Sequence, residues 1–366
     1  MVRKVGKVLD LTIEANVSPC AHICRYCSIG DRGPKFPLTR WMAFVERFLD
    51  WQKAQGPEAP GVQGGFLPAF NFDLNALVRL NQWLKGTQGF TLTWIPLGGV
   101  KMRSELEMRK WLLERQAIGI EGVSGSFVGH GAVHDRWNGR HGDFAFLMRT
   151  LRTAAELGMK HGTTLFLTKS SLPLMDELAR ILDALPTPYD GRHVRPFYYI
   201  GHGAHHDAER ITEEDRDNLP AFVKESVGRD FDLRSEREWI EIVRGEKETP
   251  QDLYLHLELT ADNIDRLEAM SCDEIFADLE TRARATLSAF PSLRELCEAY
   301  GDHYGTKIYI PVDIARRWLF RFLDAHPMDF DRSLLHYHFG RSLTPPPLWD
   351  HQPQWGFERA IEFADP

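Results

Sequence analysis

The chain has 366 residues, of which 43% are hydrophobic and 26% are charged. This composition is that of an ordinary globular protein with enough apolar material for a full core, so it excludes wholesale disorder and a small disulfide-stapled fold. The 44 lysines and arginines are outnumbered by 52 aspartates and glutamates, and the resulting net charge of −8 argues against a nucleic-acid partner.

The sequence indicates neither a transmembrane helix nor a signal peptide. No run of residues approaches the roughly 18 consecutive apolar residues of a transmembrane helix. The first residues, MVRKVGKVLDLTIE, lack the apolar stretch and the cleavage site of a signal peptide. We therefore expect a cytoplasmic protein without a membrane partner, in a compartment where clustered thiols more often hold a metal or do redox chemistry than form a disulfide.

The first part of the chain alternates short apolar or β-branched segments with segments of helical periodicity. Six strands are expected, over residues 7–14, 62–70, 90–95, 122–127, 163–167 and 194–200. Apolar residues at helical spacing predict helices between them, among others over 41–49, 144–154 and 174–185. This alternation predicts a parallel sheet, and six units are too few for a closed eight-stranded barrel. The expected fold is α/β, a partial (β/α)6 TIM-like barrel.

The rhythm changes near Gly228, where a charged run begins. We expect residues 1–228 to form the partial barrel, 229–250 a charged connector and 251–366 an α+β C-terminal extension. In the extension, a segment from Tyr254 alternates like a half-buried strand, and helical segments follow. The proline- and tryptophan-rich tail is expected to be extended.

Three of the five cysteines, Cys20, Cys24 and Cys27, lie in the loop after the first predicted strand with the spacing C-x3-C-x2-C. Soft thiolates suit iron, and a short loop can direct several of them to one point, which indicates a polynuclear iron–sulfur cluster. No fourth ligand is evident nearby, so one iron would stay open for a substrate or cofactor. Two other interpretations remain open, namely a structural zinc site completed by His22 and a redox dithiol of Cys24 and Cys27.

At these residues the sequence resembles the radical S-adenosylmethionine (radical SAM) enzymes, whose hallmark is this spacing with an aromatic residue, here Tyr26, before the last cysteine. The family places the motif after strand one of a six-unit partial barrel. The resemblance implies that Cys20, Cys24 and Cys27 bind a [4Fe-4S] cluster whose open iron is chelated by S-adenosylmethionine (SAM), and that Tyr26 is one of the cofactor-binding residues. It also implies an external one-electron reductant of flavodoxin or ferredoxin type, and a 5′-deoxyadenosyl radical that abstracts hydrogen from the substrate.

The second predicted strand carries a partial match to the family. Radical SAM enzymes usually have Gly-Gly-Glu there, which helps to hold the SAM amino group, and this chain has Gly64 and Gly65 followed by Phe66. The glycines fit a close backbone approach to SAM or a simple turn. Phenylalanine cannot accept a hydrogen bond from an ammonium group, so part of that role must be met elsewhere.

The middle of the chain, from Gly122 to Lys169, resembles the radical SAM subgroup that includes peptide-modifying maturases. Ser126 lies where the resemblance implies a contact with SAM, and Lys169 is similarly placed after the fifth strand; a serine at a strand end also commonly binds local backbone. His134 and Asp135 are either a proton-transfer pair or structural loop residues.

The loop after the sixth predicted strand holds a cluster of histidines. Gly201 resembles the family's motif near the adenine of SAM. His202 and His205, with the nearby His206, are candidates for contact with substrate or SAM, for a second metal site, or for an ordinary solvated loop. Together with His134, the residues Tyr199, His202 and His205 are the candidate catalytic side chains.

The C-terminal part adds only Cys272 and Cys297, so we expect one cluster and no auxiliary ones. The maturase-like middle region favours a ribosomally made peptide or a protein side chain as substrate in natural-product maturation. A small intermediate, such as a sugar or nucleoside, is the alternative substrate. A zinc-stabilised binding module without catalysis is the alternative of another class.

Overall fold

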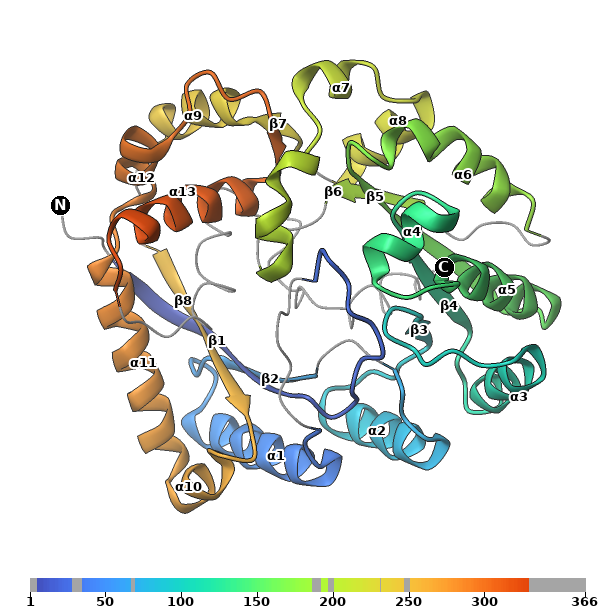
Figure 1. Cartoon of the computed structure of the whole chain (residues 1–366). Coiled ribbons are helices and arrows are strands. Elements are labelled where there is room, and N and C mark those ends of the chain that lie inside the picture. The colour runs from blue at the N-terminus through green and yellow to red at the C-terminus, as the bar shows by residue number, and fades with distance from the viewer. Residues whose placement is uncertain are drawn as a thin grey trace. The chain divides into compact units, whose positions relative to one another are not determined.

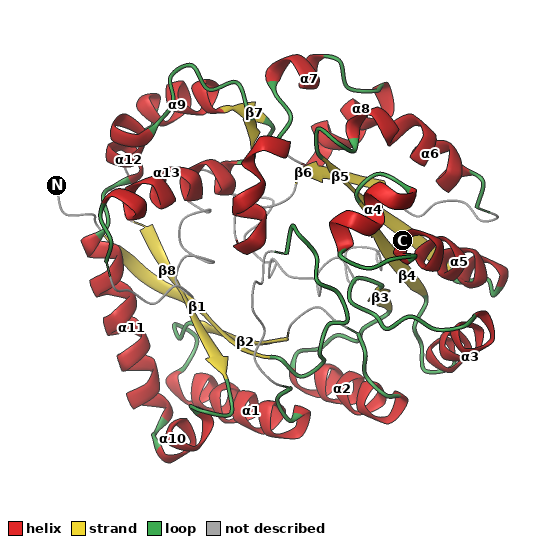
Figure 2. Ribbon diagram, viewed as in Figure 1, coloured by secondary structure: helices red, strands yellow, loops and turns green. Residues whose placement is uncertain are grey.

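The structure is a computed structural model that describes residues 5–27, 35–66, 70–185, 192–196, 201–230, 232–246 and 251–328. The chain divides into two compact units. The first comprises residues 1–17, 31–67 and 234–346, and the second comprises residues 18–30, 68–233 and 347–366. Each unit combines parallel strands with helices (Figures 1 and 2).

The first unit is built on a three-stranded parallel sheet of β1 (Val5–Ala15), β2 (Gly61–Phe66) and β8 (Gln251–Leu259), in the order β2-β1-β8. Two short strands, β7 (Arg234–Ser235) and β9 (Ile308–Tyr309), form a separate antiparallel pair. The helices are α1 (Leu38–Gln55), α9 (Glu236–Gly245), α10 (Ile264–Ala269), α11 (Cys272–Ala289), α12 (Leu293–Tyr300) and α13 (Pro311–Ala325).

Strand β1 shows why this sheet forms. Its residues Leu11, Ile13 and Ala15 are fully buried, and helices α1 and α11 both pack against the strand. Trp41 of α1 fixes the contact, because its indole Nε1 donates a hydrogen bond to the carbonyl oxygen of Ile13 at 3.1 Å. Alternation along the strand places one apolar set against the helices.

A buried carboxylate organises the helices at the other end of the first unit. Glu236, at the start of α9, is 1% exposed. Its carboxylate accepts hydrogen bonds from Arg317 Nε at 3.0 Å, from Trp318 Nε1 at 2.9 Å and from Arg321 Nη1 at 2.9 Å, all on α13. A buried charge with this many donors is satisfied, and it ties α13 to α9.

The second unit holds a four-stranded parallel sheet in the order β3-β4-β5-β6. Its strands are β3 (Trp94–Pro96), β4 (Gly122–Phe127), β5 (Lys160–Leu167) and β6 (Arg192–Pro196). Its helices are α2 (Leu74–Thr87), α3 (Glu105–Gln116), α4 (Gly131–Asn138), α5 (Asp143–Glu156), α6 (Met175–Asp183), α7 (Glu213–Asp217) and α8 (Ala221–Asp230), with 3-10 segments η1 (Leu172–Leu174) and η2 (Gly201–Glu209). The central strand β5 is buried from His161 to Leu167, as expected for a parallel strand covered on both faces.

The α/β class and the strand–helix alternation of a partial (β/α)6 barrel are confirmed. All six predicted strands are present and parallel to their neighbours, and the predicted helices correspond to α1, α5 and α6. Strand β3 begins later than predicted, because the side chain of Asn81 hydrogen-bonds both the N–H and the carbonyl of Leu92 in place of a neighbouring strand.

The predicted C-terminal strand is also present, as β8, and it pairs with β1. The charged connector contains β7 and α9 within its described residues, and the tail from residue 329 onward lies outside the described residues. The boundaries at 228 and 251 stay a prediction. Among the described helices, none has the length and apolar character needed to cross a bilayer.

Candidate functional site

The cysteine loop, residues 18–27, belongs to the second unit. Cys20, Cys24 and Cys27 are all partly exposed free thiols. The backbone N–H of Cys27 donates to the carbonyl of Cys24 at 3.1 Å, so the last two cysteines share one tight turn. Burial, reinforced by the neighbouring Cys27, raises the pKa of the Cys24 thiol to about 12.

Backbone hydrogen bonds hold this loop to three other segments of the unit. Ala21 N donates to the carbonyl of Gly99 at 2.8 Å, and Arg25 N donates to the carbonyl of Trp137, at the end of α4, at 2.8 Å. The carbonyl of Cys27 accepts from His202 N, in η2, at 2.9 Å. The loop is therefore held to the rest of the unit at two points inside the motif and at its last cysteine.

Asn71 adds a fourth attachment. Its backbone N–H donates to Ser18 Oγ at 2.9 Å, and its side-chain amide donates to the carbonyls of Pro19 and Gly99 at 2.8 Å and 2.6 Å. One asparagine thus joins the start of the cysteine loop to the segment after β3.

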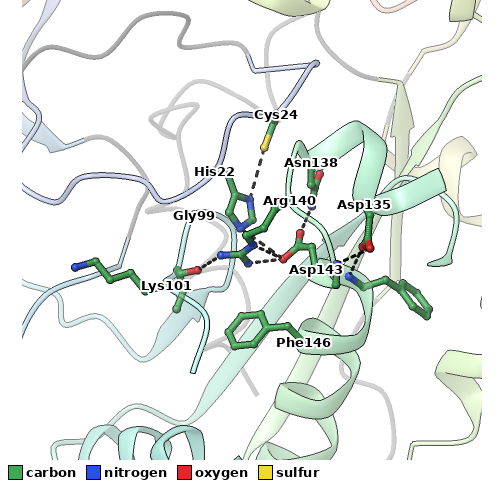
Figure 3. A network of polar contacts seen from close by, with 12 residues as sticks. His22, Cys24, Gly99, Lys101, Asp135, Asn138, Arg140, Asp143 and Phe146 are labelled. Atoms are coloured by element: carbon green, nitrogen blue, oxygen red, sulfur yellow. Dashed lines mark hydrogen bonds and ion pairs between the residues drawn. The ribbon is translucent and has the colours of Figure 1, made fainter. Parts of the chain in front are cut away.

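Beneath the loop lies a polar network centred on Asp143, the first residue of α5 (Figure 3). This fully buried carboxylate accepts hydrogen bonds from His134 Nε2 at 3.1 Å, from the Asn138 side-chain amide and from the Arg140 guanidinium. Burial alone would raise the pKa of Asp143, but these donors and the neighbouring His22 hold it well below its usual range. Arg140 extends the network by donating to the carbonyl of Val100 at 2.6 Å.

His22 connects this network to the cysteines. Its Nδ1 lies 3.6 Å from Cys24 Sγ, and its Nε2 lies 3.7 Å from Asp143 Oδ1 on the other side of the ring. Figure 3 shows the ring between the sulfur and the carboxylate. Burial lowers the pKa of His22 to about 4, so the imidazole is neutral at neutral pH in this state.

Tyr26 connects the loop to the same network by another route. Its hydroxyl donates to Asn138 Oδ1 at 2.7 Å, and Asn138 in turn donates to Asp143. The ring packs 4.7 Å from Phe166 and 6.3 Å from Trp137 between ring centroids. The aromatic residue of the motif is therefore fixed at both its ring and its hydroxyl.

A glycine makes this close packing possible. Gly139 has φ of 63°, a left-handed conformation that ends α4, and a Cβ atom there would lie 2.3 Å from the carbonyl oxygen of Ile23 in the cysteine loop. Any side chain at this position would collide with the loop backbone. The turn between α4 and α5 is thus shaped to receive the loop.

The predicted SAM-binding residues lie in different elements. Ser126 is in β4, paired in register with Thr164 of β5, and is half-buried. Lys169 is exposed, and its backbone N–H donates to the carbonyl of Glu209 at 2.8 Å; Gly201 begins η2. These three are in the unit that holds the cysteine loop.

Gly64 and Gly65 lie in β2, which belongs to the first unit. A Cβ atom on Gly65 would lie 3.3 Å from Cγ2 of Thr12 on β1. A glycine there is accounted for by tight packing between two strands, so its presence alone does not indicate a ligand.

The predicted histidines have different surroundings. His134 is fully buried, and its Nδ1 accepts from Val128 N at 3.2 Å, which leaves the proton on Nε2 for Asp143. Asp135 has other partners, since its carboxylate accepts from the backbone N–H groups of Gly142 and Phe144. The two adjacent side chains therefore serve separate contacts.

In η2, His202 and His205 are exposed, and His206 places its ring 5.1 Å from that of Trp137, edge to face. Burial, followed by the charge of Arg25, lowers the pKa of His206. Tyr199 lies outside the described residues.

Sequence reasoning missed Asp143, Asn138, Arg140 and Asn71. The available signal was the dense polar and glycine-rich run NGRHGD at 138–143, which reads equally well as a solvated turn.

The donor set fits an iron–sulfur cluster in its chemistry. Three thiols lie on one clamped loop of ten residues, and thiolate is the ligand that such clusters take. Among the described residues, no group of three or more histidine, cysteine or acidic side chains forms a ready site for a single metal ion. A polynuclear cluster takes one thiolate per iron and so keeps its cysteines farther apart than one ion would.

No protein-family model matches the sequence, and no curated protein matches it. Among solved structures, the chain is similar to Streptococcus suis SuiB bound to precursor peptide SuiA, at 16% identity and a TM-score of 0.40, over 62% of this chain and 47% of SuiB. It is also similar to Escherichia coli coproporphyrinogen III oxidase (HemN), described as a radical SAM enzyme, at 12% identity and a TM-score of 0.40, over 87% and 81% of the two chains.

A third similar structure is anSMEcpe with bound AdoMet and the Cp18Cys peptide, at 14% identity and a TM-score of 0.36, over 52% of this chain and 51% of that one. The match thus spans about half the length of SuiB and of anSMEcpe. Likeness at this level does not assign the chain to a family.

Proposed function

We propose that this protein is a radical SAM enzyme with a single [4Fe-4S] cluster bound by Cys20, Cys24 and Cys27. The observation that carries the proposal is the C-x3-C-x2-C loop with Tyr26 before its last cysteine, clamped by backbone hydrogen bonds within an α/β unit. When bound, the cluster and SAM supply a one-electron cleavage that yields a 5′-deoxyadenosyl radical able to abstract hydrogen from a substrate. The electron comes from an external reductant of flavodoxin or ferredoxin type.

The remaining residues of the second unit have binding and positioning roles in this proposal. The ends of parallel strands are where α/β proteins collect their ligands, and Ser126, Lys169 and Gly201 lie at or just beyond the ends of β4, β5 and β6. We assign these three to SAM. His202 and His205, exposed beside the backbone anchor at Cys27, are assigned to contact with SAM or substrate.

The substrate in this proposal is a peptide or a protein side chain. Its support is the maturase-like middle region around Ser126 and His134. A sugar or nucleoside intermediate is the competing substrate class, and a panel of peptides and nucleosides assayed for SAM-dependent products separates the two.

The proposal is tested by anaerobic purification and reconstitution with iron and sulfide. We expect about four irons per chain, broad visible absorption, and 5′-deoxyadenosine when SAM and dithionite are added. Alanine variants of Cys20, Cys24 and Cys27 should lose both the absorption and the SAM cleavage, whereas an alanine variant of the isolated Cys272 serves as the control and should keep both. One equivalent of zinc without the visible absorption would instead support the non-catalytic zinc module.

A further inference from the structure

His22, in the cysteine loop, has buried surroundings that the cysteine motif does not explain. His22 lies between the second cysteine of the motif and the buried Asp143, and its side chain is 2% exposed. Its Nδ1 faces Cys24 Sγ at 3.6 Å, within the range of a hydrogen bond to sulfur. Its Nε2 has no hydrogen-bond partner among the described residues and lies 3.7 Å from Asp143 Oδ1.

The chemistry of the pair fixes which partner donates. A cysteine that binds iron does so as a thiolate, which has no proton to give. In a contact between Nδ1 of His22 and that sulfur, the imidazole is then the donor. Because the ring is buried, water does not compete for the sulfur at this point.

We propose that the neutral imidazole of His22 donates an N–H hydrogen bond from Nδ1 to the Cys24 sulfur in the cluster-bound protein. This inference rests on the proposed function. On its other side the ring lies beside Asp143, which His134 and Arg140 hold through hydrogen bonds. Figure 3 shows this chain of contacts from Arg140 to Cys24.

The expected effect is on the ease of reduction. Hydrogen bonds to the sulfurs of an iron–sulfur cluster, and the outer residues that orient them, set its reduction potential. A donor to a thiolate withdraws electron density and favours the reduced state. His22 would therefore help the external reductant to deliver the electron on which SAM cleavage depends.

The experiment compares reconstituted holoproteins by EPR-monitored redox titration, together with iron content and thermal unfolding. His22→Leu removes the donor and should lower the midpoint potential, whereas His22→Gln restores an N–H donor and should return the potential toward that of the wild type. Asp135→Asn is the control, because Asp135 caps the turn between α4 and α5 without contacting the cysteine loop in any described interaction.

The outcomes distinguish a failure of the proposed function from a failure of the inference about His22. If the wild-type protein binds no cluster, or if its EPR signal does not change when SAM is added, the proposed function is refuted before any variant is compared. If His22→Leu binds full iron at the wild-type potential, the hydrogen bond has no role. If His22→Leu loses iron, His22→Gln decides, because a lowered potential in His22→Gln overturns the donor role.

Discussion

Substitution of Gly139 by alanine tests whether the turn between α4 and α5 shapes the cysteine loop. Two effects are expected. The left-handed φ of 63° costs an alanine about 1–2 kcal/mol. In addition, the new Cβ would lie 2.3 Å from the Ile23 carbonyl oxygen, and because the surroundings are close-packed backbone, the loop must move by at least about 0.7 Å to relieve the clash.

Gly142 is the matched control for this substitution. It lies three residues further along the same turn with φ of 74°, and a Cβ atom there would meet only Met102 Cε, at 3.7 Å, an ordinary contact. Both alanine variants should lose the about 1–2 kcal/mol of the left-handed φ in urea unfolding. Gly139→Ala should lose more, because only its Cβ atom collides with the loop that carries the cysteines. Changes to the surroundings of metal ligands typically cost about 10–100-fold in metal affinity, and we expect the Gly139 variant to fall in that range.

The assay is iron per chain after anaerobic reconstitution, followed over time against a competing chelator. Gly142→Ala should retain iron at the wild-type rate. Equal iron retention in both variants would show that the cysteine loop still binds iron after the clash at residue 139. It would refute the conclusion that close packing at Gly139 fixes the loop.

Three further predictions concern other parts of the chain. The double variant Cys272→Ser Cys297→Ala should keep the wild-type iron content, and a loss of iron would reveal a ligand outside the motif. Glu236→Ala should lower the free energy of unfolding by about 3–5 kcal/mol, because it removes a buried carboxylate from two arginines, and a urea titration in which Glu236→Gln loses as much as alanine would contradict the role of the charge. In the cluster-free chain, His22 has a pKa lowered from 6.5 to about 4, so its contribution to stability is complete above pH 6.5 and is lost as the pH falls toward 4. Urea unfolding at pH 7.5 and 5.5 should show a loss of about 1 kcal/mol that is absent in His22→Gln.

The sequence was sufficient to predict those features that depend on residues close together in the chain. Strand β4 was predicted over residues 122–127 as it occurs, because its residues alternate and turn residues bound it. The cysteine motif was likewise visible, since three cysteines within eight residues need no tertiary contact to be recognised.

The polar network could not be predicted, because tertiary contacts decide which polar residues belong to it. Asp135 and Asp143 are both acidic residues near the same turn, and nothing local says that one caps the helix while the other turns inward to His22. That choice is made by the left-handed glycines at 139 and 142, which set the direction of the chain. A polar run such as this one is indistinguishable by composition from a solvated surface turn.

The pairing of β8 with β1 has a consequence for the order of assembly. A contact between Lys7 N and Asp252 spans 245 residues, so the first strand gains one of its two sheet partners only after 245 further residues have been translated. Closing so long a loop is entropically slow, and the first unit is therefore expected to complete after the second, whose strands follow one another closely. The segment that bears the three thiols is therefore synthesised long before β1, the strand that precedes it in the chain, acquires its partner β8.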